Sequence, residues 1–190
     1  MTPLVVRQAS ERDSALVGDV LAEVARWLDE RGVPMWKAGE LSEKQVLAEI
    51  EEGLFFIGEI HGDSVCVIKF QLEDTLFWPD IPRGKSAFIH RLAIRRRFAG
   101  GEVSSALLHW AVRRAQSLGR PFLRLDCEAS RPKLRSIYER FGFVHHSDRQ
   151  VGPYYVSRYE LDVTAMQHNQ SPEPNPASVM TPAWQESRPR

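Results

Sequence analysis

Cysteine, net charge and long apolar runs are all scarce in this sequence, and each scarcity excludes a class of protein. The 190 residues include two cysteines, Cys66 and Cys127, and the formal net charge at pH 7 is +0. Two cysteines do not make the disulfide framework of a small secreted protein. A chain without net charge has no global field that attracts nucleic acid or an anionic membrane. Because a hydrophobic leader is also missing, we expect a cytoplasmic protein with neither kind of partner.

Positive charge is concentrated in one short run, Arg95–Arg97, which is a candidate nucleic-acid contact. Three consecutive residues on a strand or turn cannot all point the same way, and no basic helix face accompanies them. We therefore interpret the run as part of a turn that is solvated or faces phosphate.

Proline is distributed unevenly along the chain. Prolines at 172, 174, 176, 182 and 189 are separated by polar residues, and such a sequence cannot bury enough apolar surface to fold. We therefore expect a single domain over residues 1–163 and a disordered, proline-rich tail over 164–190.

Apolar periodicity within residues 1–163 predicts a mixture of strands and helices. A helical stripe from Leu16 to Leu28 follows Ser10–Asp13, which has the spacing of a capping box, and Ser42 caps a second helix. We expect strands at 4–7, 54–60, 64–72, 87–94, 123–127 and 154–161, further helices ending near 118 and 141, and a loop over 73–85. The strands at 54–60 and 64–72 form a hairpin in this interpretation.

The segment from Leu92 to Leu108 carries the clearest functional pattern. An apolar strand end, Leu92–Ile94, leads through a basic turn with Gly100 and Gly101 into a helix. Such a turn directs backbone N–H groups and the positive end of the helix dipole at one spot, which suits a pyrophosphate. An ordinary strand-to-helix turn can contain the same glycines, so a second segment is needed to decide.

That second segment is a strand at 123–127 followed by a helix at 133–141. The helix ends in the pattern Tyr138-x-x-x-Gly142-Phe143. Together the two segments resemble the GNAT superfamily of acetyl-CoA-dependent N-acetyltransferases. The cofactor motif of that family is Leu-Ala-Val, a short spacer, Arg/Gln-x-x-Gly-x-Gly/Ala and a helix with paired leucines. This chain follows the motif without a gap from Leu92 to Leu108, and the resemblance covers residues 3–162.

The chain departs from the family pattern at a few positions. Ala99 stands where Arg or Gln is usual, Glu102 and Ser104 stand where Gly or Ala is usual, and Arg131 replaces a common Asn. A rival alignment starting at Arg97 recovers Arg-x-x-Gly. We prefer the gapless alignment, because the rival places a serine where the buried leucine of the helix belongs.

The resemblance implies an α+β fold with a mixed, mostly antiparallel central sheet flanked by helices. Two neighbouring strands of that sheet splay apart beside the cofactor, and the unpaired backbone groups of Leu92, Ala93 and Ile94 would pair with its pantetheine arm. The backbone of the following turn would bind the pyrophosphate of acetyl-CoA, through Ala99, Gly100, Gly101, Glu102, Val103 and Ser104.

The chemistry implied is direct attack by an amine on the acetyl-CoA thioester in a ternary complex. Tyr138 matches the general-acid tyrosine of the family and would protonate the departing thiolate. In the alternative interpretation Tyr138 is a helix aromatic packed in the core.

The general base is open between His90 and Glu128. His90 lies on the cofactor strand, on a face that the expected alternation shares with Phe88, Leu92 and Ile94, while Glu128 follows the next strand. Cys127 is expected to be a buried thiol and not a nucleophile. We expect no metal, because His145 and His146 lack ligand spacing with other residues.

The acceptor is expected to be a small-molecule or peptide amine of unspecified identity. The absence of an acidic stripe disfavours polycationic acceptors. A non-catalytic acyl-CoA-binding sensor or scaffold of the same fold is the alternative function. The oligomeric state stays open, a homodimer included.

Overall fold

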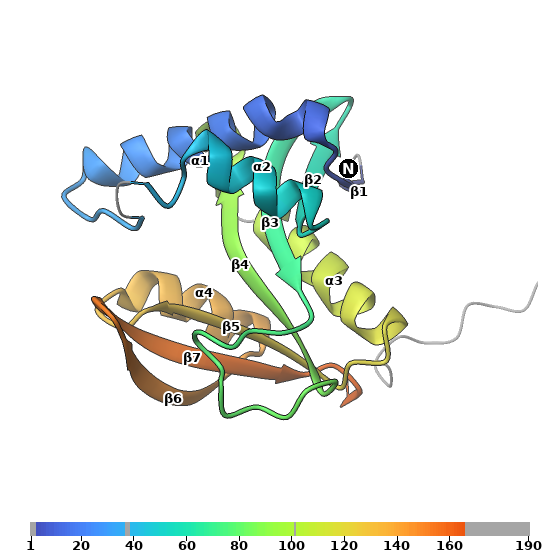
Figure 1. Cartoon of the computed structure of the whole chain (residues 1–190), viewed down its shortest axis with the longest axis vertical. Coiled ribbons are helices and arrows are strands. Elements are labelled where there is room, and N and C mark those ends of the chain that lie inside the picture. The colour runs from blue at the N-terminus through green and yellow to red at the C-terminus, as the bar shows by residue number, and fades with distance from the viewer. Residues whose placement is uncertain (1–2, 37–38, 101, 166–190) are drawn as a thin grey trace, which may run out of the picture.

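The computed structural model describes residues 3–36, 39–100 and 102–165. These residues form a seven-stranded sheet in the order β1-β2-β3-β4-β5-β7-β6, flanked by α-helices (Figure 1). The strands are β1 (Val5–Gln8), β2 (Phe55–Ile60), β3 (Asp63–Gln71), β4 (Ser86–Ile94), β5 (Phe122–Glu128), β6 (Val144–Val151) and β7 (Tyr154–Asp162). The helices are α1 (Ser14–Asp29), α2 (Glu43–Glu51), α3 (Glu102–Ser117) and α4 (Pro132–Phe141), and short 3-10 turns span Glu11–Asp13 and Arg96–Phe98.

The strand pairing confirms the mixed, mostly antiparallel sheet that the sequence predicts. Neighbours β4 and β5 are parallel, and every other neighbouring pair in the described sheet is antiparallel. A parallel pair needs a crossover, which α3 supplies between β4 and β5. No helix among the described residues combines the length and the apolar character needed to cross a membrane.

The sheet splits between β4 and β5. Only the first part of each strand is paired: Ser86–Ile89 of β4 lie beside Phe122–Leu125 of β5. Beyond this point β4 continues alongside β3, while β5 continues alongside β7. In Figure 1 the two strands start together and diverge, which leaves β1–β4 with α1 and α2 in the upper half and β5–β7 in the lower half. The predicted splay of two neighbouring strands is therefore confirmed.

Two hydrophobic cores cover the two faces of the sheet. One packs α3 and α4 on one face, with Leu107 and Leu123 at 0% exposure, and Tyr138 packs against it. The other packs α1 and α2 on the opposite face, with Val20 and Ile57 also at 0% exposure. Burial on both faces makes the central strands rigid, so the split has a defined width.

A bulge in β4 changes which residues share a face. Arg91 has a positive φ of 47°, and the pairing with β3 shifts register beside it. Its guanidinium pairs with the buried Glu49 of α2, which stabilises this unusual backbone. A bulge inserts one residue and reverses the alternation of side chains after it.

The bulge corrects one prediction about His90. Leu92 and Ile94 pack on the α3 side with Ala87 and Ile89, whereas Ala93 packs against α1 and α2. His90 keeps the face of Phe88 but does not share it with Leu92 and Ile94. The sequence pattern was wrong here, because strict alternation ignores the extra residue.

The predicted helix caps are confirmed. Asp13 accepts hydrogen bonds from the backbone N–H and the hydroxyl of Ser10, both at 2.8 Å, and a 3-10 turn here leads into α1. Ser42 accepts from the backbone N–H of Gln45 at 3.3 Å. Gly142 ends α4 with a φ of 116°, a left-handed conformation that favours glycine.

The sequence pattern missed β6 and predicted six of the seven strands. Most of its residues are polar and exposed, because it is an edge strand that pairs only with β7. The predicted disordered tail falls on residues that lie outside the described part of the chain, apart from the exposed Thr164 and Ala165.

Candidate active site

The open edge of β4 is the first component of the site. The N–H of Arg95 donates to Val65 of β3 at 2.9 Å. Peptide groups alternate in direction along a strand, so those of Ile94 and Leu92 point to the other edge, where β5 has diverged. This edge can hydrogen-bond to an extended ligand that carries amide groups.

The turn between β4 and α3 lies at the end of this open edge. Gly100 has a φ of 128°, and α3 begins at Glu102 with its N-terminus at the turn. Glu102 is exposed, so its carboxylate is solvated, while Val103 is buried beneath the turn. Gly101 lies outside the described residues. The helix N-terminus gives this turn a positive potential that backbone groups supply.

Two of the basic side chains in the turn already have acidic partners. Arg95 donates to Asp19 and Glu23, each at 2.7 Å, and Arg97 donates to Asp63 at 3.1 Å. Both arginines therefore have acidic partners within the protein, and the pair of Arg97 and Asp63 lies at the surface. The backbone of the turn and of α3 adds donors of its own for an anion.

Tyr138 lies on the α3 and α4 side of the split. The centre of its ring lies 6.0 Å from the ring centre of Phe143 and 6.4 Å from the ring centre of Tyr159. Burial raises the pKa of its phenol well above the ordinary value, and the nearby Cys127 and Asp126 raise it further. The hydroxyl therefore remains a proton donor at every physiological pH.

Cys127 is buried, as the sequence predicts. It is 7% exposed, and burial raises the pKa of its thiol to about 12. A thiol of this kind is a poor nucleophile, because the reactive form is the thiolate.

His90 lies on the opposite side of the split, between two carboxylates. Its Nε2 is 3.0 Å from Oδ2 of Asp74, and its Nδ1 is 3.4 Å from Oδ1 of Asp126. The side-chain amide of Gln71 lies 3.3 Å from Nε2, and the ring of Phe77 lies 5.9 Å from the imidazole. An imidazolium formed here would have a carboxylate beside each ring nitrogen.

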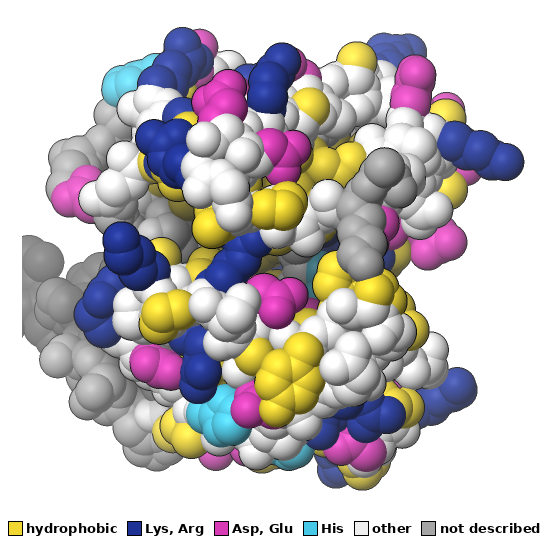
Figure 2. Space-filling model, turned by 90° about the vertical axis from the view of Figure 1, so that its left-hand side faces the viewer, with side chains coloured by type: hydrophobic (Ala, Val, Ile, Leu, Met, Phe, Trp, Pro, Cys, Tyr) yellow, Lys and Arg dark blue, Asp and Glu magenta, His cyan; other side chains and the backbone are white. Residues whose placement is uncertain are grey.

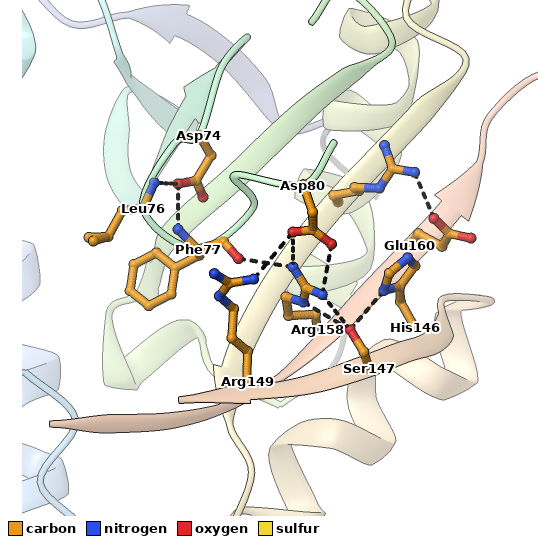
Figure 3. Close-up of polar contacts among 10 residues, drawn as sticks. Asp74, Leu76, Phe77, Asp80, His146, Ser147, Arg149, Arg158 and Glu160 are labelled. Atoms are coloured by element: carbon orange, nitrogen blue, oxygen red, sulfur yellow. Dashed lines mark hydrogen bonds and ion pairs between the residues drawn. The ribbon is translucent and has the colours of Figure 1, made fainter. Parts of the chain in front are cut away.

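Asp74 is held as a carboxylate. Its side chain is 3% exposed, and its Oδ1 accepts from the backbone N–H groups of Leu76 and Phe77 at 3.0 and 2.9 Å (Figure 3). Burial works to raise the pKa of this carboxyl. The contact with His90 and the two N–H groups outweigh burial, and the pKa lies below its usual range.

Asp126 behaves in the opposite way. Burial raises its pKa to about 6, and the Asp74 carboxylate adds to the rise, while His90 and Arg158 oppose it. Its Oδ1 is buried and accepts no hydrogen bond from the described residues. Asp126 can therefore exchange a proton near neutral pH, unlike Asp74.

The sequence pattern did not identify Asp74 and Asp126 as site residues. Asp126 left no signal of its own, since charged and apolar residues alternate along its strand, and Asp74 lies in a loop and left none either. Side chains alternate along β5, so Glu128 lies on the same face as Asp126 but two residues further along the strand, away from His90. His90 therefore has the better position for a base.

Three of these side chains can be compared with a metal site. Asp74, His90 and Asp126 each offer a ligand atom, and these atoms lie within 4.8 Å of one another. The two carboxylates face opposite nitrogens of one imidazole, however, so a single ion would not meet all three along the observed directions. The arrangement suits a proton-carrying imidazole better than a metal, and the absence of a metal stays a prediction.

The split between β4 and β5 therefore has a phenol on one side and an imidazole on the other. Tyr138 packs in the core formed with α3 and α4, and His90 lies on the opposite face with Asp74 and Asp126. Figure 2 shows one face of the molecule hollowed across its middle, with charged and hydrophobic side chains along the hollow.

Comparisons with known proteins agree on one family. The model of the acetyltransferase (GNAT) family matches residues 21–143. The chain is 30% identical over 160 residues to YesJ of Bacillus subtilis (strain 168), named an N-acetyltransferase, which covers 80% of this chain and 87% of YesJ.

Solved structures agree with this family. A GNAT-family acetyltransferase from Listeria monocytogenes 4b F2365 superposes with a TM-score of 0.68 at 25% identity, covering 83% of this chain and 95% of that one. YncA from Salmonella typhimurium, whose structure contains acetyl-CoA, gives a TM-score of 0.64 at 12% identity, covering 93% of this chain and 100% of YncA. The second likeness concerns the fold alone.

Proposed function

The chain belongs to the acetyltransferase (GNAT) family and is an acyltransferase, and on this premise we propose that it moves the acetyl group of acetyl-CoA to a primary amine. The amine attacks the thioester directly in a ternary complex. The acceptor is a small molecule or a peptide that carries one ammonium into the hollow beside His90.

One observation carries this proposal. Tyr138 and His90 approach the point where β4 and β5 separate from opposite faces of the sheet. Amide formation from a thioester is accelerated by a base at the attacking nitrogen and by an acid at the departing sulfur. A non-catalytic acyl-CoA sensor would not need this pair.

The cofactor would lie along the open edge of β4. The backbone groups of Leu92 and Ile94, on either side of Ala93, would pair with the pantetheine amides, and the turn from Ala99 to Ser104 would bind the pyrophosphate. Backbone recognition explains why Ala99 and Ser104, which depart from the family pattern, are tolerated there.

The proton steps follow from the side chains. The acceptor ammonium gives a proton to His90, which Asp74 orients, and the free amine attacks the acetyl carbon. The C–N bond forms, the C–S bond breaks, and the Tyr138 hydroxyl protonates the thiolate of CoA. Solvent then takes the second proton of the new amide nitrogen and the proton of the imidazolium, and it returns one proton to the phenolate.

Asp126 serves the acceptor in this mechanism. Its Oδ1 lies beside His90 at the end of the paired region and accepts no hydrogen bond from the described residues. An acceptor ammonium would supply a donor and favour the charged form of the carboxylate. Binding of the amine and placement of its proton near His90 are thereby coupled.

A thiol-release assay tests the proposed function. The protein is incubated with acetyl-CoA and a panel of free amines, amino acids and peptides with free N-termini. We expect CoA release that depends on the amine, together with a higher melting temperature in acetyl-CoA. A folded protein with no thermal shift at millimolar acetyl-CoA would contradict the proposal. A thermal shift without CoA release from any amine would favour the sensor.

A further inference from the structure

The side chain of Arg158 on β7 is the most completely bonded charged group near the site. Its residue is 5% exposed, and each of its five N–H groups has an acceptor (Figure 3). The Nε and Nη2 groups donate to Ser147 at 2.9 and 2.7 Å. The other bonds run to Asp80, at 2.6 and 3.1 Å, and to the carbonyl of Phe77, at 3.2 Å.

These bonds join the two halves of the split sheet. Asp80 and Phe77 belong to the loop that leaves β3 in the upper half, whereas Arg158 and Ser147 lie on β7 and β6 in the lower half. The indole of Trp78, which is 1% exposed, packs against the guanidinium with 4.7 Å between ring centre and Cζ. The loop is thus fixed to the lower half by a charge, a carbonyl and a ring.

The same loop carries the partners of His90. Asp74 and Phe77 both contact the imidazole, and the backbone N–H of Phe77 donates to Asp74. Arg158 therefore binds the carbonyl of the residue whose N–H orients the carboxylate. A shift of this segment would therefore change the contact between Asp74 and His90.

We infer that Arg158 is a positioning residue for the acceptor side of the active site, which sets the loop from Asp74 to Asp80 and through it the orientation of His90. The guanidinium is needed for its shape, because only a planar fork can bond Asp80 through two nitrogens while it reaches Phe77 and Ser147. Lysine would keep the charge and lose this geometry. The role rests on the proposed function of His90.

The test reads His90 itself, so it does not depend on finding an acceptor. The ¹⁵N resonances of the His90 ring are measured in histidine-labelled protein and assigned with the His90→Gln variant. Asp74→Asn defines the spectrum of an imidazole that has lost its carboxylate. We expect Arg158→Lys and Asp80→Asn to move the His90 resonances most of the way to those of Asp74→Asn.

Arg149→Met is the matched control. Arg149 contacts the same Asp80 at 3.5 Å but, among the described residues, makes no hydrogen bond to Phe77 or Ser147, and its side chain is 37% exposed. The His90 ring resonances of Arg149→Met should stay at the positions they have in the parent protein. The melting shift in acetyl-CoA should be unchanged in Arg158→Lys, Asp80→Asn and Arg149→Met, because the cofactor edge lies on β4.

Two outcomes would overturn the inference. His90 resonances that stay at the parent positions in folded Arg158→Lys and Asp80→Asn would show that Arg158 only packs the loop. Equal displacement in Arg149→Met would show a general charge effect. If Arg158→Lys does not fold, Asp80→Asn decides, since its side chain is 44% exposed. Absence of acetyl transfer would contradict the proposed function and leave these spectra as evidence on the loop.

Discussion

At the scale of single residues, the two sides of the split differ in how freely they exchange protons. Tyr138 is held in its protonated form by burial, whereas Asp126 titrates near neutral pH. His90 has a carboxylate beside each ring nitrogen. In the proposed mechanism, an amine that arrives as an ammonium loses its proton on one side, while the thiolate gains one on the other.

The hydroxyl of Tyr138 should be needed for turnover but not for folding. Tyr138→Phe removes one oxygen from a packed ring, so melting temperature and acetyl-CoA affinity should be retained. Turnover at saturating amine should fall by roughly 10²–10⁴-fold, the usual contribution of a positioned acid. Tyr155→Phe is the control, because Tyr155 is 52% exposed. Full activity of Tyr138→Phe with chemistry rate-limiting would make Tyr138 a packing residue.

Asp126 should make stability depend on pH in a defined direction. Its pKa is about 6 in the folded protein against an ordinary 3.8, so the folded state binds the proton more tightly than the unfolded state. This stabilisation is complete below pH of about 4 and is lost as the pH rises through about 6.

The variant Asp126→Asn checks this direction. The amide of the variant does not titrate. The free energy of unfolding of the variant minus that of the parent should therefore rise by on the order of 3 kcal/mol between pH about 4 and about 7. Urea unfolding at the two pH values measures the difference. A constant difference, or one of opposite sign, would contradict the assignment of a raised pKa to Asp126.

At the scale of elements, the turn before α3 depends on one glycine conformation. Gly100 has a φ of 128°, where a β-branched residue is strained, although no heavy atom lies within 4 Å of an added Cβ. Gly100→Val should therefore change the turn and abolish the melting shift caused by acetyl-CoA. Gly119→Val is the matched control, because Gly119 has a φ of 65° and equally open space at the other end of α3. It should lower stability and keep the cofactor shift, and loss of the shift in both variants would contradict the role of the turn.

The elements that the sequence predicted are those whose position is determined by the pattern of their own residues. Leu107 and Leu108 are buried in α3, and Gly142 ends α4, as their spacing indicated. The polar strand β6 could not be predicted, since its position comes from its partner β7. The bulge at Arg91 was likewise hidden, because it is stabilised by Glu49, which lies far away in the sequence.

The same limit applies to the site. The family resemblance pointed to Tyr138, and its place on the cofactor strand pointed to His90, but their roles depend on which faces of the sheet they occupy. Asp74 comes from a loop and Asp126 from another strand, and only the fold brings them to His90. Local pattern finds residues of the right chemical type, and long-range pairing decides which of them meet.

At the scale of the whole molecule, the folded domain should end at Val163. Val163 is 0% exposed, its N–H donates to Pro121 at 2.9 Å, and its carbonyl accepts from Gln116 at 2.6 Å. A truncated chain ending at Val163 should melt within a few degrees of the full chain and bind acetyl-CoA equally well. A chain that ends at Asp162 is the matched control, and its melting temperature should be lower because it lacks the buried Val163. Loss of cofactor binding on truncation at Val163 would show that residues 164–190 contribute to the site.

Amide hydrogen exchange with and without saturating acetyl-CoA tests most directly that the split between β4 and β5 is the cofactor site. The open edge of β4 at Leu92–Ile94 and the first turn of α3 are the backbone that the cofactor would cover. We predict slower exchange in these two segments and unchanged exchange in the outer strands β1 and β6. Protection confined to other segments, or no protection in a protein whose melting temperature acetyl-CoA raises, would contradict the account.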